Sequence, residues 1–193
     1  MHSRVTLIFS TFDNMKSQRL LSLVLLIVLT VFVLSSCKYS KEPKQFKLDH
    51  LSLSYPSYLQ QAQDVYPSAQ TIFQAKNGYR DVYFILVDWG NNSGDSMFNV
   101  ISDSVVNQLK ANLKEVNIEK SDSSFTINDM KAREAQVSGI LSQHGMDIRF
   151  LFDLVIFQTK DGHIYQTAGW LMRHKQQLWL KDLQKAAFSL RIN

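Results

Sequence analysis

The sequence predicts an α+β domain with a largely antiparallel sheet. Segments with strand-like patterns follow one another along the chain, and only two segments have the periodicity of an amphipathic helix. Strands that come in runs, with helices inserted among them, favour antiparallel pairing. Hydrophobic residues make up 45% and charged residues 20% of the chain, as in ordinary globular proteins.

The first half of the domain begins with a short alternating strand. Residues 51–55 read Leu-Ser-Leu-Ser-Tyr and are followed by Pro56, which indicates a strand with one polar face. Residues 71–75 predict a second short strand. Residues 82–89 are apolar at both odd and even positions, as expected for a central strand that is covered on both faces.

An amphipathic helix follows the loop of residues 90–96, which ends with a good helix cap. Lys110 and Lys114 lie in its last turn, where positive charge suits the helix dipole. The apolar residues at helical spacing are Phe98, Ile101, Val105, Leu109 and Leu113.

The second half of the domain is dominated by long strands. After shorter strand and turn segments at residues 116–121 and 125–127, three long strands are predicted at residues 131–141, 146–159 and 163–172. Asp161-Gly162 is a strong hairpin turn signal between the last two. In the middle strand every second residue from Met146 to Ile156 is apolar, so this face must pack on a helix or a second sheet.

The chain closes with a second helix at residues 177–187, followed by an extended stretch. Its apolar side is formed by Trp179, Leu180, Leu183 and Ala187. Beyond it, Phe188, Leu190 and Ile192 alternate with polar residues.

The first 36 residues have the pattern of a signal peptide. Lys16 and Arg19 precede fifteen residues, 20–34, that are apolar except for Ser22 and Thr30. This run is shorter than the ~20 apolar residues that a membrane-spanning helix needs. Translation could also begin at Met15, which opens a well-formed basic segment of its own.

Cys37 ends this segment and is the only cysteine of the chain, so it cannot form an intramolecular disulfide. Leu34-Ser35-Ser36-Cys37 resembles the lipobox of bacterial lipoproteins, although serine replaces the usual glycine or alanine before the cysteine. We expect cleavage before Cys37 and acylation of its sulfur, with the chain held on the membrane by its acyl chains. The alternative is an uncleaved signal anchor with an incidental thiol.

The expected organisation is a signal peptide at residues 1–36, a flexible polar tether at 37–47 and a single domain at 48–193. No aspartate or acidic cluster follows Cys37. By resemblance to lipoprotein sorting signals, this favours the outer membrane, facing the periplasm.

Charge and motifs exclude several function classes. The formal charge is +4, but without residues 1–36 the chain has 18 basic and 16 acidic residues, too little excess charge for a nucleic-acid partner. No nucleophile elbow or phosphate-binding loop is present, so we predict no catalytic residues and no cofactor.

The order of elements resembles the PsbP/Mog-like superfamily, which includes small bacterial lipoproteins of the DcrB type. The segments that carry this resemblance are LSLSYP at residues 51–56, GHIYQTAGW at 162–170 and AFSLRI at 187–192. Many members have a tryptophan shortly after the Tyr-Pro pair, where this chain has Tyr58.

This resemblance implies an αβα sandwich with a largely antiparallel sheet flanked by helices. Members support photosystem assembly or bind a small GTPase, so the resemblance also implies a non-catalytic interaction or accessory module in the envelope, with an envelope protein as partner. The alternative is a periplasmic lipoprotein that binds a small molecule.

Three groups of residues are candidate sites. His144 and His174, with Asp147 nearby, could approach one another as a surface metal site, although solvated loop histidines are commoner, and we predict no metal site. Arg149 and Asp153 share one strand face, beside Arg133 and Glu134 on the preceding strand; they could mark a polar groove or an ion-paired sheet surface. The aromatics that could line a partner site or belong to the core are Tyr79, Tyr83, Trp89, Tyr165 and Trp170.

Overall fold

The computed structural model describes residues 42–48, 50–62, 69, 71–75, 82–92, 94–121, 124–143 and 145–192. The predicted signal peptide, Met15 and Cys37 lie outside the described residues, as do Tyr79 and His144. Within the described part of the chain, no helix is both long and apolar enough to span a membrane.

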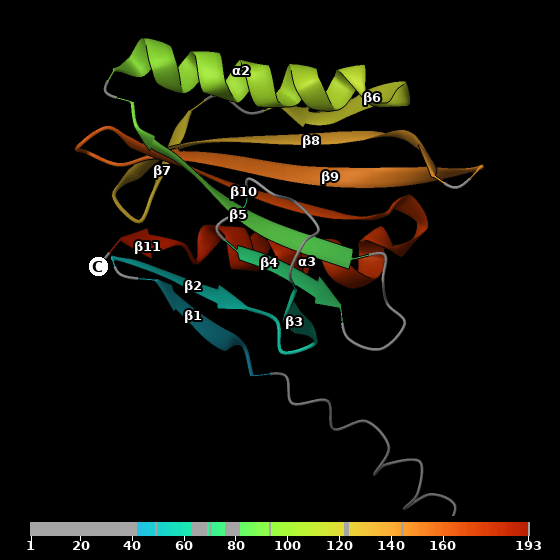
Figure 1. The fold of residues 1–193 in the computed structure, drawn as a ribbon, viewed down its shortest axis with the longest axis horizontal. Coiled ribbons are helices and arrows are strands. Elements are labelled where there is room, and N and C mark those ends of the chain that lie inside the picture. Colours follow the sequence, from blue (N-terminus) through green and yellow to red (C-terminus); the bar gives the residue numbers. More distant parts are fainter. Residues whose placement is uncertain are drawn as a thin grey trace, which may run out of the picture. The chain divides into compact units, whose positions relative to one another are not determined.

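An eight-stranded sheet forms the centre of the domain (Figure 1). Its order is β3 (Leu59–Ala62), β4 (Thr71–Ala75), β5 (Val82–Asn91), β10 (His163–Met172), β9 (Met146–Gln158), β8 (Met130–Gln143) and β6 (Lys114–Ser121), with β7 (Phe125–Ile127) paired to β8. All of these pairs are antiparallel.

Helix α2 (Asp95–Ala111) covers part of one face of this sheet. Phe98, Ile101 and Val105 of the helix pack in one core cluster with Leu154 and Ile156 of β9. The apolar face predicted for this strand therefore packs on a helix at Leu154 and Ile156, whereas Met146 at the other end of the strand is 59% exposed.

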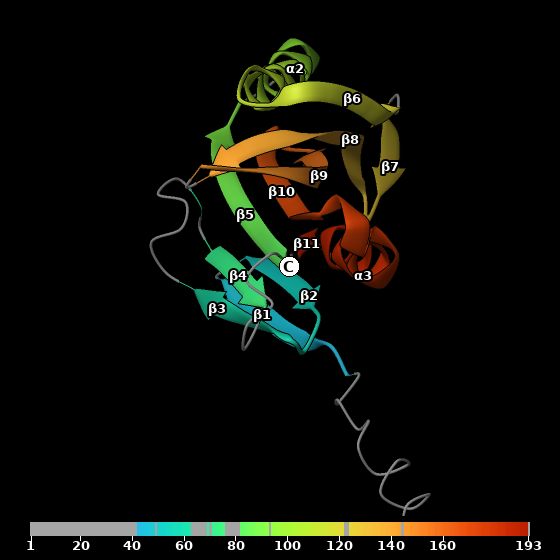
Figure 2. The same cartoon turned by 90° about the vertical axis from the view of Figure 1, so that its right-hand side faces the viewer.

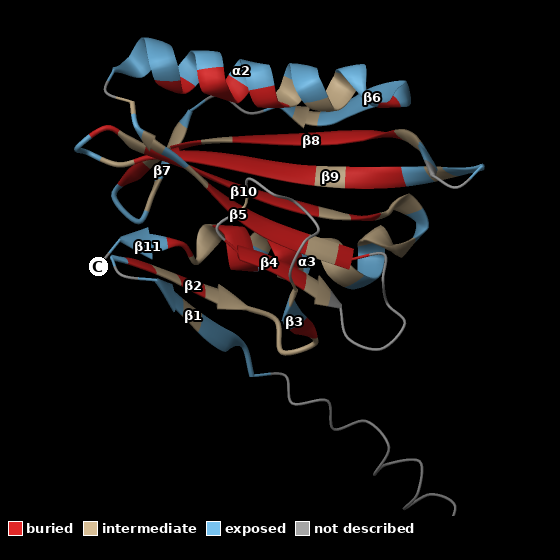
Figure 3. Cartoon of the chain, viewed as in Figure 1, coloured by how far each residue is buried: buried red, intermediate tan, exposed pale blue. Residues whose placement is uncertain are grey.

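The opposite face is covered by two different elements, as the view in Figure 2 shows. One is helix α3 (Gln176–Phe188), which follows a short 3-10 helix at Arg173–Lys175. The other is a three-stranded antiparallel sheet in the order β1 (Lys44–Leu48), β2 (Leu51–Tyr55) and β11 (Arg191–Ile192). Leu51 and Leu53 of β2 and Leu183 of α3 belong to the same core cluster, and Figure 3 shows how completely the interior of the domain is buried.

The expected α+β class, an αβα sandwich with a largely antiparallel sheet flanked by helices, is wrong for this chain. Its described residues are predominantly strand, with two α-helices, and a second sheet does much of the covering on one face. A helix is ~10 Å wide whereas eight strands at ~4.8 Å spacing are more than three times wider, so α3 alone cannot cover that face.

The second sheet includes strand β1, which lies partly in the stretch that was predicted as a tether. Residues 44–47 pair with β2 as the first part of β1, and Phe46 packs edge-on against Phe73 of β4 with ring centroids 5.7 Å apart. Most individual strands are confirmed, and those at Leu51–Tyr55, Thr71–Ala75 and His163–Met172 have the predicted bounds.

Candidate functional site

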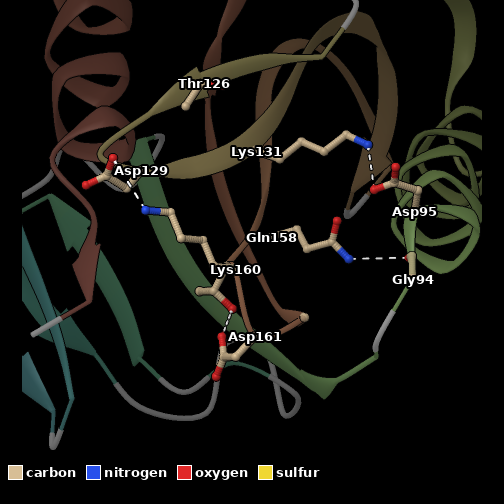
Figure 4. Close-up of a pocket in the computed structure, with 10 residues that line it drawn as sticks. Gly94, Asp95, Thr126, Asp129, Lys131, Gln158, Lys160 and Asp161 are labelled. Atoms are coloured by element: carbon tan, nitrogen blue, oxygen red, sulfur yellow. Dashed lines mark hydrogen bonds and ion pairs between the residues drawn. The ribbon is translucent and has the colours of Figure 1, made fainter.

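Three chain turns meet at one end of the large sheet and enclose an open polar cavity of about 440 Å³ (Figure 4). They are the start of α2, the turn between β7 and β8, and the turn between β9 and β10. We call this cavity the polar basin. It is lined by Gly94, Asp95, Thr126, Asp129, Lys131, Gln158, Thr159, Lys160, Asp161 and Gly162.

Local backbone preferences explain why these turns form here. Asp161-Gly162, predicted as a hairpin turn, joins β9 to β10, and Gly162 has a φ of 87° that suits glycine. Asn128 and Asp129 form the turn before β8 at φ values of 48° and 64°, a region that these two residue types tolerate better than most.

Most charged groups of the polar basin form ion pairs or hydrogen bonds with one another. The Lys131 ammonium lies 2.9 Å from an Asp95 carboxylate oxygen, and the Lys160 ammonium lies 3.9 Å from Asp129. Asp161 accepts a hydrogen bond from the Thr159 hydroxyl, which lowers the pKa of the Asp161 carboxyl. The basin therefore offers hydrogen-bonding groups of both kinds, without a dominant charge.

Gln158 lies at the base of the polar basin and is only 7% exposed. Its amide nitrogen donates to the Gly94 carbonyl at 3.3 Å, while its carbonyl oxygen points away from Gly94 into the cavity. Among the described residues, no donor bonds to that oxygen. Gly94, before the helix, provides no side-chain cap for α2. An amide oxygen without a donor that opens into the cavity and uncapped helix amides both suit a polar ligand or peptide there.

A cluster of histidine, tyrosine and aspartate links the large sheet to the three-stranded sheet. The His163 Nε2 atom lies 2.6 Å from an Asp88 oxygen, and the His50 Nε2 atom lies 2.6 Å from the Tyr165 hydroxyl. The rings of His163 and Tyr165 stack at 4.6 Å. Burial, and then the charges of Asp88 and Asp161, raise the pKa of the Tyr165 hydroxyl to about 12.

Two carboxyl groups lie buried between the large sheet and α3. Glu134 and Asp153 are each 3% exposed, and the Gln136 amide donates to both, at 3.1 and 3.0 Å. Lys120 of β6 lies 2.8 Å from Glu134, and Gln184 of α3 donates to it at 3.1 Å. Burial, and then the Glu134 charge, raise the pKa of Asp153 to about 7.

The structure separates the four residues that were expected to mark either a polar groove or an ion-paired sheet surface. Asp153 and Glu134 come together, but under α3 rather than on an open sheet surface. Arg149 pairs with Glu115 at the start of β6. Arg133 lies on the opposite face of the sheet and donates to Asp103 of α2 at 2.9 Å.

The predicted aromatic set also divides between the two faces. Tyr83 and Trp170 stack at 5.0 Å on the face that α2 covers in part, and the Trp89 indole donates to Gln166 at 3.0 Å. Tyr165 lies in the core cluster of the other face. These aromatics therefore do not line a single site.

The suggested metal site is not formed by the described residues. Asp147 accepts from Ser142 at 2.5 Å and lies 3.6 Å from Lys114. No group of three potential metal ligands occurs in the part of the chain that the structure describes.

Sequence reasoning missed the polar basin and His50. The turn signal at Asp161-Gly162 identified one wall of the basin, but nothing in the sequence indicated which other turns would meet it. His50 and Tyr165 are 115 positions apart, so their contact depends on how the two sheets pack.

The overall fold is shared with solved structures of very different sequence. The cyanobacterial PsbP protein CyanoP from Synechocystis matches with a TM-score of 0.54 and 9% identity, over 83% of this chain and 99% of that chain. The Ran-binding protein Mog1p from Saccharomyces cerevisiae matches with a TM-score of 0.52 and 6% identity, over 79% and 96%.

The domain has a PsbP/Mog-like fold. The resemblance carried by residues 51–56, 162–170 and 187–192 is thus confirmed at the level of the fold. A protein from Bacteroides thetaiotaomicron also shares it, with a TM-score of 0.51 and 14% identity, over 79% of this chain and 49% of that chain. No family model and no curated protein matches the sequence.

Proposed function

We propose that this chain is a bacterial envelope lipoprotein, anchored through acylated Cys37, whose PsbP/Mog-like domain is a non-catalytic interaction module. The observation that carries the proposal is the extent of the fold match with Mog1p, a Ran-binding protein, which spans 79% of this chain. The domain would likewise bind a protein, here one of the bacterial envelope.

The polar basin is the surface we assign to this partner. Its walls are turns fixed to the ends of long strands and to a helix of 17 residues, so its hydrogen-bonding groups are held in place before a partner binds. Among the residues that the structure describes, the Gln158 carbonyl oxygen has no hydrogen-bond donor, and the first amides of α2 have no side-chain acceptor. Both suit a polar segment of a partner that supplies donors and acceptors.

Capture of the partner tests this assignment. Chemical crosslinking in envelope fractions, followed by affinity purification, should recover a specific protein with the wild type and less of it with Lys160→Glu, whose side chain is 81% exposed. Lys181→Glu, an equal charge change on an exposed residue of α3, should behave as wild type. Failure to recover any specific protein, or equal recovery with all three chains, would reject the basin as the binding surface.

The anchor is tested separately. Cys37→Ala should abolish incorporation of labelled fatty acid and release the protein from the membrane fraction, because Cys37 is the only cysteine. Outer-membrane vesicles should contain the wild type on their periplasmic side. Continued acyl labelling of the alanine variant would refute lipidation at this residue.

A small polar ligand is the second candidate occupant of the basin. The cavity of about 440 Å³ is within the usual size range of ligand sites, but its lining is more polar than most of them. Native mass spectrometry of the chain that starts after Cys37 should then show a retained small molecule. A mass equal to that of the polypeptide alone would remove this candidate.

A further inference from the structure

The three-stranded sheet has an outer face on which Gln45, Lys47 and Arg191 are exposed and Ser52 and Ser54 are half-buried. Phe46 of β1 and Leu51 and Leu53 of β2 point inward to the core, so alternate residues point outward. In register, Lys47 and Arg191 lie on either side of Ser52, in one row across the three strands. The face consists of Gln45, Lys47, Ser52, Ser54 and Arg191, and we call it the outer face.

The outer face is cationic. Lys47 and Arg191 are exposed and lie about two strand spacings apart, or ~10 Å. None of its residues is acidic. Lys44, at the start of the same hairpin, adds a third exposed positive charge close by.

Counted over the described residues, these cations differ from most others of the domain in having no ion-pair partner. Within the described residues, no carboxylate lies within ion-pair distance of Lys44, Lys47 or Arg191. By contrast, the large sheet and its helices pair most of their cations with acids of their own. The paired residues are Lys114, Lys120, Lys131, Arg133, Arg149, Lys160, Arg173 and Lys185.

The covalent chain limits how far this sheet can be from the membrane. Strand β1 begins at Lys44, seven residues after Cys37. Even a fully extended chain spans no more than ~3.6 Å per residue, so at most ~25 Å separates the lipidated residue from the start of β1. The residues between them include Lys38 and Lys41 but only one acid, Glu42.

We propose that the outer face of the three-stranded sheet lies on an anionic phospholipid surface, with Lys47 and Arg191 bound to lipid phosphates. The inference rests on the proposed lipid anchor at Cys37. Arginine, lysine and serine are suited to phosphate oxygens, and basic residues that a tether holds near an anionic bilayer are attracted to it. An acidic protein surface would match the same charges, but only the bilayer is brought within reach by the chain itself. The sheet contact leaves the polar basin for a partner.

Lysine footprinting of the lipidated protein tests the proposal. The protein is reconstituted in vesicles of phosphatidylcholine alone or of phosphatidylcholine with phosphatidylglycerol at a three-to-one ratio, and acetylated with a water-soluble amine reagent. The anionic vesicles should slow acetylation of Lys47 about fivefold, the factor expected for one cation held at an anionic surface. Lys110 of α2, on the far side of the large sheet, is the internal control and should react equally in both.

Charge reversal supplies the matched variants. Anionic vesicles should also slow acetylation of Lys44. Lys47→Glu with Arg191→Glu should return Lys44 to the rate seen with phosphatidylcholine alone, while Lys110→Glu with Lys181→Glu should keep the slower rate. Unchanged reactivity of Lys47 in vesicle-bound wild type would overturn the surface contact and leave the anchor intact. Protein that remains in the supernatant of both vesicle types would overturn the anchor, and this inference with it.

Discussion

At the scale of single residues, Asp153 is a buried carboxyl group under α3 whose pKa is raised by its surroundings. Two carboxyl groups, each 3% exposed, share one amide donor and face one lysine. The raised pKa of Asp153, at about 7, means that the folded domain holds a proton that the unfolded chain releases near pH ~4. The stability contributed by this proton is present at low pH and is lost as the pH rises to about 7.

Replacing Asp153 with asparagine should remove this dependence. The carboxamide stays neutral, so the free energy of unfolding of Asp153→Asn should increase relative to wild type by about 1.4 kcal/mol per pH unit between pH ~4 and ~7. Urea unfolding across this range measures it. Asp129→Asn, a change at a side chain that is 89% exposed, is the control, and its free energy of unfolding should depend on pH as that of wild type does. The same pH dependence in Asp153→Asn would contradict the raised pKa of Asp153.

Asp153 also shows what residue patterns can and cannot predict. Its position on one strand face with Arg149, near Glu134 on the neighbouring strand, followed from the strand periodicity. The periodicity does not show that α3 covers Asp153 and Glu134 but leaves Arg149 uncovered. That depends on where α3 begins, 23 residues later in the chain than Asp153. The same pattern therefore left both a groove and an ion-paired surface open.

At the scale of elements, Gly169 of β10 determines how closely α3 approaches the sheet. A methyl group at Gly169 would lie 3.1 Å from Cδ1 and 3.2 Å from Cβ of Leu183. Such crowding costs about 1–3 kcal/mol, offset by up to ~1 kcal/mol because alanine suits a strand better than glycine.

Gly169→Ala should therefore unfold at lower urea concentration, with a loss of about 1 kcal/mol. In a Leu183→Ala background the same substitution should cost much less, because the crowding atoms beyond Cβ are gone. A double-mutant cycle measures this coupling. An equal loss in both backgrounds would show that Leu183 is not the neighbour that matters.

Asn128 ties the end of α3 to the turn beside the polar basin. Its side-chain amide donates to the carbonyl groups of Phe188 and Leu190 at 2.9 and 2.8 Å, and its own φ is 48°. Asn128→Ala loses both bonds and adopts a backbone region that alanine disfavours, for an expected cost of about 1–3 kcal/mol.

Amide hydrogen exchange at residues 188–192, together with urea unfolding, measures this effect. Asn128→Gly should recover part of the loss, since glycine tolerates the positive φ but cannot donate to the two carbonyl groups. An alanine variant as stable and as well protected as wild type would show that the two bonds do not hold the helix end.

At the scale of the whole molecule, local patterns predicted the elements better than their assembly. The strands at Leu51–Tyr55 and His163–Met172 were predictable because alternation and turn residues are local signals. The strand at Lys44–Leu48 was not, because its burial pattern is mostly exposed and only Phe46 contacts the core. The αβα sandwich that the family resemblance implied has no place for this strand, and the second sheet that it helps to form makes that architecture wrong.

The polar basin and the outer face are also products of assembly. Each combines segments that are far apart in the chain, such as Lys47 with Arg191. With the outer face on the membrane and the partner bound in the basin, as we propose, the domain would be held between the two.

Site-specific photo-crosslinking tests the role of the basin, on which the proposed function depends, most directly. A photoreactive amino acid at Thr126, which lines the polar basin, is compared with one at Ser104, an exposed position on α2, in the lipidated protein inside living cells. We predict a discrete protein adduct from Thr126 that is absent from Ser104. No adduct from Thr126, or the same adducts from both positions, would contradict the assignment of the basin as the partner's binding surface.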